Sequence, residues 1–186
     1  LDGFDDAGAH AALDRLLATV SVEVVLAEVV IPYLRDLGDR WTADRASIAQ
    51  EHFASNLLRG RLLGLARDWG SGNGPRVLLA CLPGEVHDLG LIIFGLLVAR
   101  RGWRITLLGA DTPFDSLLAS IHELHPAAVV LVSTDGRRLE EHAEDIRRTA
   151  ALVPTALAGG HADRVGTLGA RALPSDIVEA AASIAG

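Results

Sequence analysis

The first part of the chain spaces its apolar residues at intervals of three and four, the spacing of one face of a helix. This pattern predicts a first helix over Ala7–Thr19. Ser21 is a typical N-cap for a second helix that runs to about Trp41, and Pro32 inside it is expected to kink or divide it. A third helix is predicted to start within three residues of Trp41 and to run to about Trp69. We therefore expect a helical bundle.

After the Gly/Ser/Asn/Pro cluster Gly70–Pro75, short apolar runs alternate with helical stretches, which is typical of a parallel sheet covered on both faces. The predicted strands are Arg76–Leu82, Trp103–Leu108, Ala127–Ser133, Val153–Ala158 and a short run at Arg171–Leu173. The predicted helices are Asp88–Arg101, Phe114–His122, Arg138–Ala150 and Asp176–Ile184. The predicted fold class is α + α/β: a helical bundle over residues 1–70, followed over residues 75–186 by a doubly wound, flavodoxin- or Rossmann-like five-stranded sheet.

Composition narrows the classes of function. The net charge is −7 and the basic residues are scattered, so we do not expect this segment to grip nucleic acid by itself. No apolar run approaches the roughly 18 residues that span a membrane. The single cysteine, Cys81, lies in an apolar run, which favours a buried structural thiol and a cytoplasmic location. Because the chain starts at Leu1 and contains no methionine, we expect it to be part of a longer protein.

The loop after the first strand is expected at the crevice where ligands bind in such sheets. It holds Glu85, His87 and Asp88 between Gly84 and Gly90. A helix cap, a surface histidine and an anion site are all compatible with this loop. The glycines permit close approach by a bulky ligand, and Glu85 could orient one imidazole nitrogen while the other binds metal. A lone histidine suits a metal whose other positions a macrocycle fills.

A dinucleotide site at Gly70-x-Gly72-x-Gly74 is excluded by position, because these glycines precede the first strand instead of following it. We expect them to form a hinge.

The pattern Glu85-x-His87-x-x-Gly90 resembles the signature of cobalamin-binding domains of the methionine-synthase type. The resemblance implies that His87 is the lower axial ligand of cobalt and that the cofactor's nucleotide tail enters the α/β domain. A serine and a Gly-Gly line the tail pocket in that family; Asp135 stands here where the family often has leucine. The positions to which the resemblance assigns cofactor contact are Glu85, His87, Asp88, Gly90, Ser133, Thr134, Gly159 and Gly160.

A second pattern, Trp41 followed after nine residues by Glu51-His52, is by itself compatible with a buried anchor and two helix-surface residues. Beside the loop it resembles light-sensing, adenosylcobalamin-dependent transcriptional repressors of the MerR type. The resemblance covers essentially the whole chain and implies that these three residues line the upper axial face. Those proteins place a histidine directly after the tryptophan, where this chain has Thr42, so capture of cobalt by a second histidine is not expected at that position.

Three functions fit these patterns. The leading hypothesis is a homo-oligomeric cobalamin sensor that responds to cofactor occupancy or light, with DNA read by a helix-turn-helix module outside this chain. Adenosylcobalamin is the expected cofactor, with methylcobalamin and hydroxocobalamin as alternatives. The second hypothesis is a corrinoid methyl-carrier protein of a methyltransferase system, and the third is a cofactor store. Because no nucleophile stands beside an activating base, we do not expect catalysis by this segment.

Overall fold

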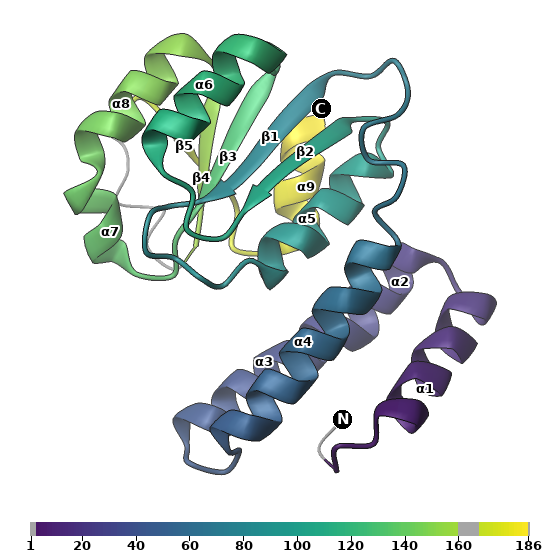
Figure 1. The fold of residues 1–186 in the computed structure, drawn as a ribbon. Helices are drawn as coiled ribbons and strands as arrows, with labels where there is room; N and C mark the ends of the chain where they lie inside the picture. The colour runs from purple at the N-terminus through teal and green to yellow at the C-terminus, as the bar shows by residue number, and fades with distance from the viewer. Residues whose placement is uncertain (1–2, 160–167, 186) are drawn as a thin grey trace. The chain divides into compact units, whose positions relative to one another are not determined.

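The computed structural model describes residues 3–159 and 168–185. The chain divides into two compact units, Leu1–Gly64 and Leu65–Gly186 (Figure 1). No helix in the described ranges is both long and apolar enough to cross a membrane.

The first unit is entirely helical. Its elements are α1 (Asp6–Thr19), α2 (Val22–Val25), the π-helical segment η1 (Leu26–Val30), α3 (Ile31–Thr42) and α4 (Ile48–Gly64). The cap predicted at Ser21 is confirmed, because its side chain accepts a hydrogen bond from the backbone N–H of Val24. Buried leucine, valine and alanine side chains of the later helices form its core: Val25, Leu26, Val30, Leu37, Ala54, Leu57, Leu58 and Leu62.

Pro32 divides the long second helix, as predicted. Proline lacks a backbone N–H, and its ring conflicts with the carbonyl four residues earlier in an α-helix. Here the wider turn η1 ends two residues before Pro32, which occupies the first turn of α3, where the missing N–H costs nothing.

Helix α4 is shorter than the sequence pattern predicted at both ends. It starts at Ile48 because Ser47 and Gln50 form a capping box: Ser47 Oγ accepts from the Gln50 N–H, and Gln50 Oε1 accepts from the Ser47 N–H. Asp44, near the expected start, has a left-handed backbone with φ of 54°. The helix ends at Gly64, well before Trp69.

The second unit is a five-stranded parallel sheet in the order β2-β1-β3-β4-β5, as in flavodoxin-like folds. The doubly wound class predicted from sequence is confirmed. The strands are β1 (Arg76–Cys81), β2 (Arg104–Gly109), β3 (Ala128–Val132), β4 (Thr155–Ala158) and β5 (Arg171–Ala172). The helices are α5 (Leu89–Ala99), α6 (Phe114–Leu124), α7 (Gly136–Glu141), α8 (Ala143–Leu152) and α9 (Ile177–Ala185). The single helix expected over Arg138–Ala150 is two helices, because the backbone leaves helical geometry at His142.

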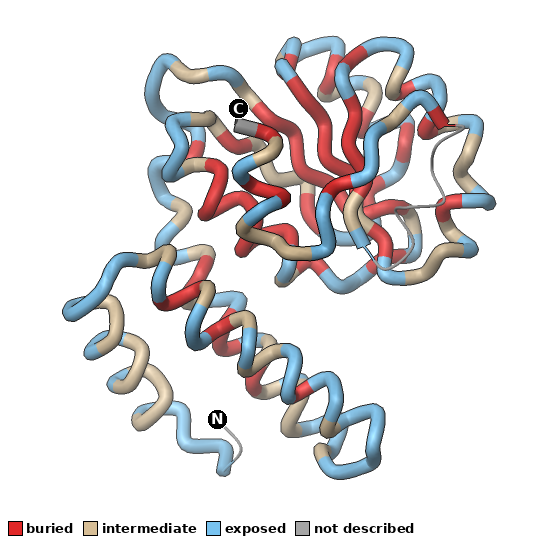
Figure 2. The backbone as a smooth tube through the Cα atoms, turned by 180° about the vertical axis from the view of Figure 1, so that it is seen from behind, coloured by how far each residue is buried: buried red, intermediate tan, exposed pale blue. Residues whose placement is uncertain are grey.

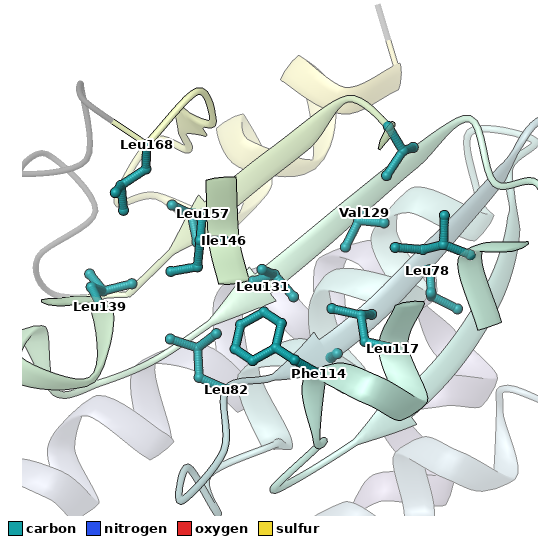
Figure 3. Close-up of a cluster of buried hydrophobic side chains, with 13 residues drawn as sticks. Leu78, Leu82, Phe114, Leu117, Val129, Leu131, Leu139, Ile146, Leu157 and Leu168 are labelled. Carbon is teal, nitrogen blue, oxygen red and sulfur yellow. The ribbon is translucent and has the colours of Figure 1, made fainter. Parts of the chain in front are cut away.

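Helices cover both faces of the sheet. On one face, α5 and α9 pack side by side (Figure 1). On the other, α6, α7 and α8 enclose a cluster that includes Leu78, Phe114, Leu131 and Ile146 (Figure 3). The buried parts of the chain concentrate in the central strands and in α5 (Figure 2). Such continuous burial explains why β1 and β3 are apolar at nearly every position.

The segment before β1 is hydrogen-bonded to the sheet at Trp69 and Gly74, and the hinge expected from its glycines stays a prediction. The Ile105 N–H donates to the Trp69 carbonyl at 2.7 Å, and Arg104 Nε donates to the Gly74 carbonyl at 2.8 Å. Trp69 is buried, and its ring lies beside Gly95 of α5. The division between the two units falls before this segment, at Gly64 and Leu65.

Candidate functional site

The loop that follows β1 lies at the point where the sheet order reverses, since β1 has β2 on one side and β3 on the other. Two contacts with Asp111, just beyond β2, hold it. The Gly84 N–H donates to Asp111 Oδ1 at 2.6 Å, and the Asp111 N–H donates to the Glu85 carbonyl at 2.8 Å. Gly84 has φ of 77°, a conformation that glycine adopts without strain. The loop is therefore a fixed turn.

Glu85 and His87 form the centre of the site. The Glu85 side chain is fully buried, whereas the His87 side chain is 71% exposed. Glu85 Oε1 lies 2.6 Å from His87 Nδ1 and also accepts from the His87 backbone N–H at 3.0 Å. Because a carboxylate only accepts hydrogen bonds, Nδ1 carries the proton and Nε2 keeps its lone pair. The imidazole is thus oriented as a ligand at Nε2.

The second oxygen of Glu85 is held by the strand-end segment after β3. Glu85 Oε2 accepts from the Thr134 backbone N–H at 2.7 Å and from the Thr134 hydroxyl at 2.6 Å, and Arg138 Nη1 lies 3.5 Å away. Burial, the largest single effect, would raise the pKa of Glu85. The hydrogen bonds from Thr134, and then those from His87, outweigh it and lower the pKa to about 2. Glu85 is consequently a carboxylate at neutral pH.

Ser133 is buried beside this network but is directed mainly elsewhere. Its hydroxyl donates to the Asp135 carbonyl at 3.0 Å and accepts from the Asp135 N–H at 3.2 Å, while Glu85 Oε2 is 3.5 Å away. The closest hydroxyl on Glu85 is therefore that of Thr134. Sequence analysis included Thr134 among the cofactor-contacting positions but gave it no specific role. Its contact with Glu85 could not be predicted, because that contact depends on the pairing of β3 with β1.

Asp88 and Cys81 lie behind the loop. Asp88 is buried and begins α5, where its carbonyl accepts from the Ile92 N–H at 3.0 Å. The pKa of Cys81 is raised to about 12, first by burial and then by the negative charges of Asp88 and Glu85. The thiol is neutral and buried, as the sequence predicted, and a neutral thiol is a poor metal ligand.

A cavity of about 320 Å³ opens beside the loop, between the carboxyl ends of β3 and β4 and the first turns of α5 and α9. Gly90, three residues after His87, contributes to its wall, and a Cβ built there would meet no atom within 4 Å. The residues that line it are Gly90, Leu91, Phe94, Val130, Val132, Ala158, Gly159, Pro174, Ser175, Ile177 and Ala180. The sequence singled out two of them; those of α9 and the segment before it carry no motif.

Gly159 is required by geometry. Its φ is 122°, and a Cβ built on it would lie 1.8 Å from the Ser133 carbonyl oxygen. Only glycine allows the end of β4 to pass so close to the end of β3. Gly160, the other half of the predicted Gly-Gly pair, lies outside the described residues.

The residues predicted for the upper face all belong to the first unit. Trp41 is 53% exposed in the last turn of α3, and with Thr42 and residues 44–48 it lines an open hollow. Glu51 lies in the first turn of α4 and His52 follows it, with His52 Nδ1 2.7 Å from Glu51 Oε2. The Ser55 hydroxyl donates to Glu51 Oε1 at 2.7 Å. The second unit thus brings together Glu85, His87, Thr134 and the cavity. In the first unit, Glu51 contacts His52 and Ser55, and Trp41 lines the hollow.

The donor set of the second unit fits a metal that brings its own ligands. In the described parts of the chain, no three His, Cys, Asp or Glu side chains gather where they could hold a bare ion. One exposed, oriented imidazole beside an apolar cavity suits a metallo-macrocycle with a bulky appendage. The fold and the site together fit an α/β module that holds such a metallo-macrocycle.

Comparisons with known proteins point to the same kind of ligand. Residues 1–63 match the family model described as "B12 binding domain". The chain is 36% identical over 151 residues to the HTH-type transcriptional repressor CarA of Myxococcus xanthus, covering 79% of this chain and 51% of that protein. It is 32% identical over 164 residues to the HTH-type transcriptional repressor CarH of the same organism, covering 87% and 55%. The chain therefore spans about half the length of these curated relatives.

Solved structures share the fold. The Methanosarcina barkeri monomethylamine corrinoid protein superposes with a TM-score of 0.81 at 15% identity, covering 98% of this chain and 92% of that one. A cobalamin-binding protein from Desulfitobacterium hafniense gives 0.55 at 18% identity, with the same two shares. Residues 1–63 thus match the B12-binding domain family, and the chain resembles about half of each repressor.

Proposed function

We propose that this chain is the sensor module of a cobalamin-responsive transcriptional regulator, with adenosylcobalamin as its cofactor. The observation that carries the proposal is the buried Glu85 carboxylate, which fixes the Nδ1 of an exposed His87 next to an apolar cavity. The similarity to two HTH-type repressors supports a regulatory role and not a catalytic one. A regulator that acts on DNA works in the cytoplasm.

The second unit holds the lower half of the cofactor. His87 Nε2 binds cobalt, and Glu85 keeps the imidazole in the tautomer that leaves this nitrogen free. The cavity that starts at Gly90 takes the displaced nucleotide tail. When bound, the cofactor supplies a cobalt–carbon bond that light can break.

The first unit covers the upper face. The exposed ring of Trp41 shields the cobalt–carbon bond, and Glu51 accepts hydrogen bonds from the upper ligand. The Thr42 hydroxyl donates to the Gly38 carbonyl at 2.9 Å, so it is engaged within its own helix. A change at the upper ligand would act through Trp41, Glu51 and His52 on the first unit, and a DNA-binding module outside the chain would respond to the resulting change in association.

The test is reconstitution with adenosylcobalamin in the dark, with absorption spectra and size-exclusion profiles recorded before and after green light. We expect a spectrum of cobalt bound by histidine in place of the cofactor's own base, and a change of elution volume after illumination. The variant His87→Ala should lose that spectrum; if it does not, the loop is not the cobalt site. Histidine ligation without any response to light, but with methyl transfer to and from partner enzymes, would favour the corrinoid methyl carrier.

A further inference from the structure

We propose that the cavity between α5 and α9 selects corrinoids by the base of their nucleotide tail, accepting a benzimidazole and rejecting a purine such as adenine. This inference rests on the proposed function, in which the tail enters the cavity, and adds the class of corrinoid that the site accepts.

The first argument is the chemistry of the cavity wall. Of the described lining residues, ten present aliphatic or aromatic side chains or no side chain, and Ser175 contributes a hydroxyl. Phe94, Leu91 and Ile177 provide most of the bulk. The volume of the cavity is about 320 Å³, near the lower limit of ligand pockets at roughly 300 Å³.

The second argument is that the backbone of the strands is already engaged. Val130 and Val132 of β3 pair with Ala156 and Ala158 of β4. Beyond the paired segment, the Ser133 N–H donates to the Ala158 carbonyl at 3.2 Å. On the other side, the Leu173 N–H donates to the Leu157 carbonyl at 2.8 Å. Among the described residues, the sheet side of the cavity therefore offers mainly carbon surface.

These features discriminate between the two bases. Adenine carries an exocyclic amine with two N–H donors as well as ring nitrogens that accept, whereas dimethylbenzimidazole has methyl groups at its outer edge. The Ser175 hydroxyl can accept from one amine hydrogen at most in an ordinary geometry. A buried donor without a partner weakens binding by about tenfold or more. Methyl groups gain from the same apolar wall.

Gly90 connects the cavity to the proposed metal ligand along the chain. Gly90 follows His87 by three residues, and a Cβ built on Gly90 points into open space. A Cβ there displaces no protein atom, and a branched side chain occupies more of that space. Substitution at Gly90 therefore separates binding of the tail from binding of the corrin.

The experiment titrates the cofactor-free chain with three adenosylated corrinoids. These are cobalamin, its adenine counterpart pseudocobalamin, and cobinamide, which has no nucleotide tail. Each free corrinoid holds its own base on cobalt to a different extent. That extent is measured by acid titration of the free compound and corrected for, because only the open form is competent to bind. We expect corrected affinity for cobalamin to exceed that for pseudocobalamin at least tenfold, and equal affinities would overturn the inference.

The variant Gly90→Val provides the second arm. It should lower the affinity for cobalamin at least tenfold, towards that of cobinamide, and retain cobinamide binding with histidine on cobalt, which also shows that the variant is folded. Unchanged cobalamin affinity in this variant would place the tail elsewhere and overturn the inference. If the wild-type chain bound none of the three corrinoids, the proposed function itself would fail, a result distinct from binding without preference.

Discussion

At the scale of single residues, Glu85 determines what His87 can do. Its two carboxylate oxygens have different partners. Oε1 accepts a hydrogen bond from His87, and Oε2 accepts one from Thr134 and lies 3.5 Å from Arg138. Removing either set of contacts leaves the carboxylate free to rotate or to take a proton. Thr134 is therefore a positioning residue for the imidazole, although we assign it no contact with cobalt.

The substitution Thr134→Val tests this role. It keeps the side-chain shape and the backbone N–H, but removes the 2.6 Å hydrogen bond to Glu85 Oε2. We expect about tenfold weaker binding of cobalt by His87, the magnitude typical of partners that orient a histidine ligand. The measurement is a titration with cob(II)inamide, which has no base of its own, followed by the nitrogen hyperfine splitting in its electron paramagnetic resonance spectrum. Thr134→Ser should restore the signal; if valine matches wild type, Thr134 has no positioning role.

The low pKa of Glu85 makes the stability of the cofactor-free chain depend on pH. An unfolded glutamate titrates at about 4.5 and the folded one at about 2, so the folded state favours the carboxylate. This contribution, about 3 kcal/mol, is complete above pH 4.5 and is lost as the pH falls towards 2. Glu85→Gln should lower the free energy of unfolding by about this amount at pH 7, and the difference should shrink below pH 4.5.

Urea unfolding measures this effect when followed by the fluorescence of Trp69 and Trp103 in a Trp41→Phe background. Asp135→Asn is the matched control, because hydrogen bonds and charge from the exposed Arg137 also lower the pKa of Asp135 to about 2. Screening by water should leave that variant close to wild type. A constant difference between Glu85→Gln and wild type from pH 7 to pH 2 would contradict the assignment.

His87, Glu85 and Gly90 could be found from sequence because they lie within six residues of one another and directly follow a recognisable strand. The hydrogen bonds of Thr134 to Glu85 join positions 49 residues apart, and the lining from α9 is more distant still. Only the pairing of β1 with β3 brings the first pair together. Sequence reasoning proposed His87 and its partner Glu85, whereas the contacts of Thr134 and the lining of the cavity required the tertiary structure.

At the scale of elements, the contact between α5 and the segment before β1 anchors the helix that starts at the site. A Cβ built on Gly95 would lie 2.8 Å from the Trp69 ring and 3.0 Å from Leu79 Cδ1. Gly95 interrupted an apolar run in the sequence, and the reason is this close approach. Apolar periodicity predicted the helix itself, but not the ring that packs against it.

The substitution Gly95→Ala should destabilise the cofactor-free second unit by about 1–3 kcal/mol, because the buried ring and leucine must move. Gly90→Ala in the same helix is the control, since its Cβ meets nothing within 4 Å and should cause no loss. Urea unfolding gives both values. If the two variants were equally stable, the close packing at Trp69 would not be what the helix depends on.

Some helix boundaries could be predicted from local sequence, and others could not. The cap at Ser21 and the effect of Pro32 follow from local chemistry, and both were predicted. The start of α4 was placed up to six residues too early, although the Ser47–Gln50 capping box was a local signal that would have located it. Its end at Gly64 was missed because the residues up to Trp69 continue the apolar pattern while Trp69 packs against α5.

At the scale of the whole molecule, the described residues of the lower site belong to one compact unit and the upper-face candidates to the other. Under the proposed function, one cofactor contacts both units. Binding should therefore slow amide hydrogen exchange in residues 83–94 and 174–180 of the second unit, and also in residues 41–52 of the first. Mass spectrometry of the full chain with and without adenosylcobalamin measures this.

Protection confined to the second unit would contradict the upper-face role of Trp41, Glu51 and His52. The same measurement on His87→Ala serves as the control, because weakened binding should reduce protection in all three segments together. Protection in this variant equal to that of wild type would show that the cofactor is held without His87.

The division at Gly64 and Leu65 also has a consequence for how such a protein diverges. Under the proposed function, the residues that hold the cobalt and the nucleotide tail lie after this point, and the residues that contact the upper ligand lie before it. Mutations in the first unit can then alter which stimulus is read, as Thr42 illustrates, while the inherited holder stays intact. Proteins that share this cobalamin site can therefore diverge in the stimulus to which they respond while they retain cobalamin binding.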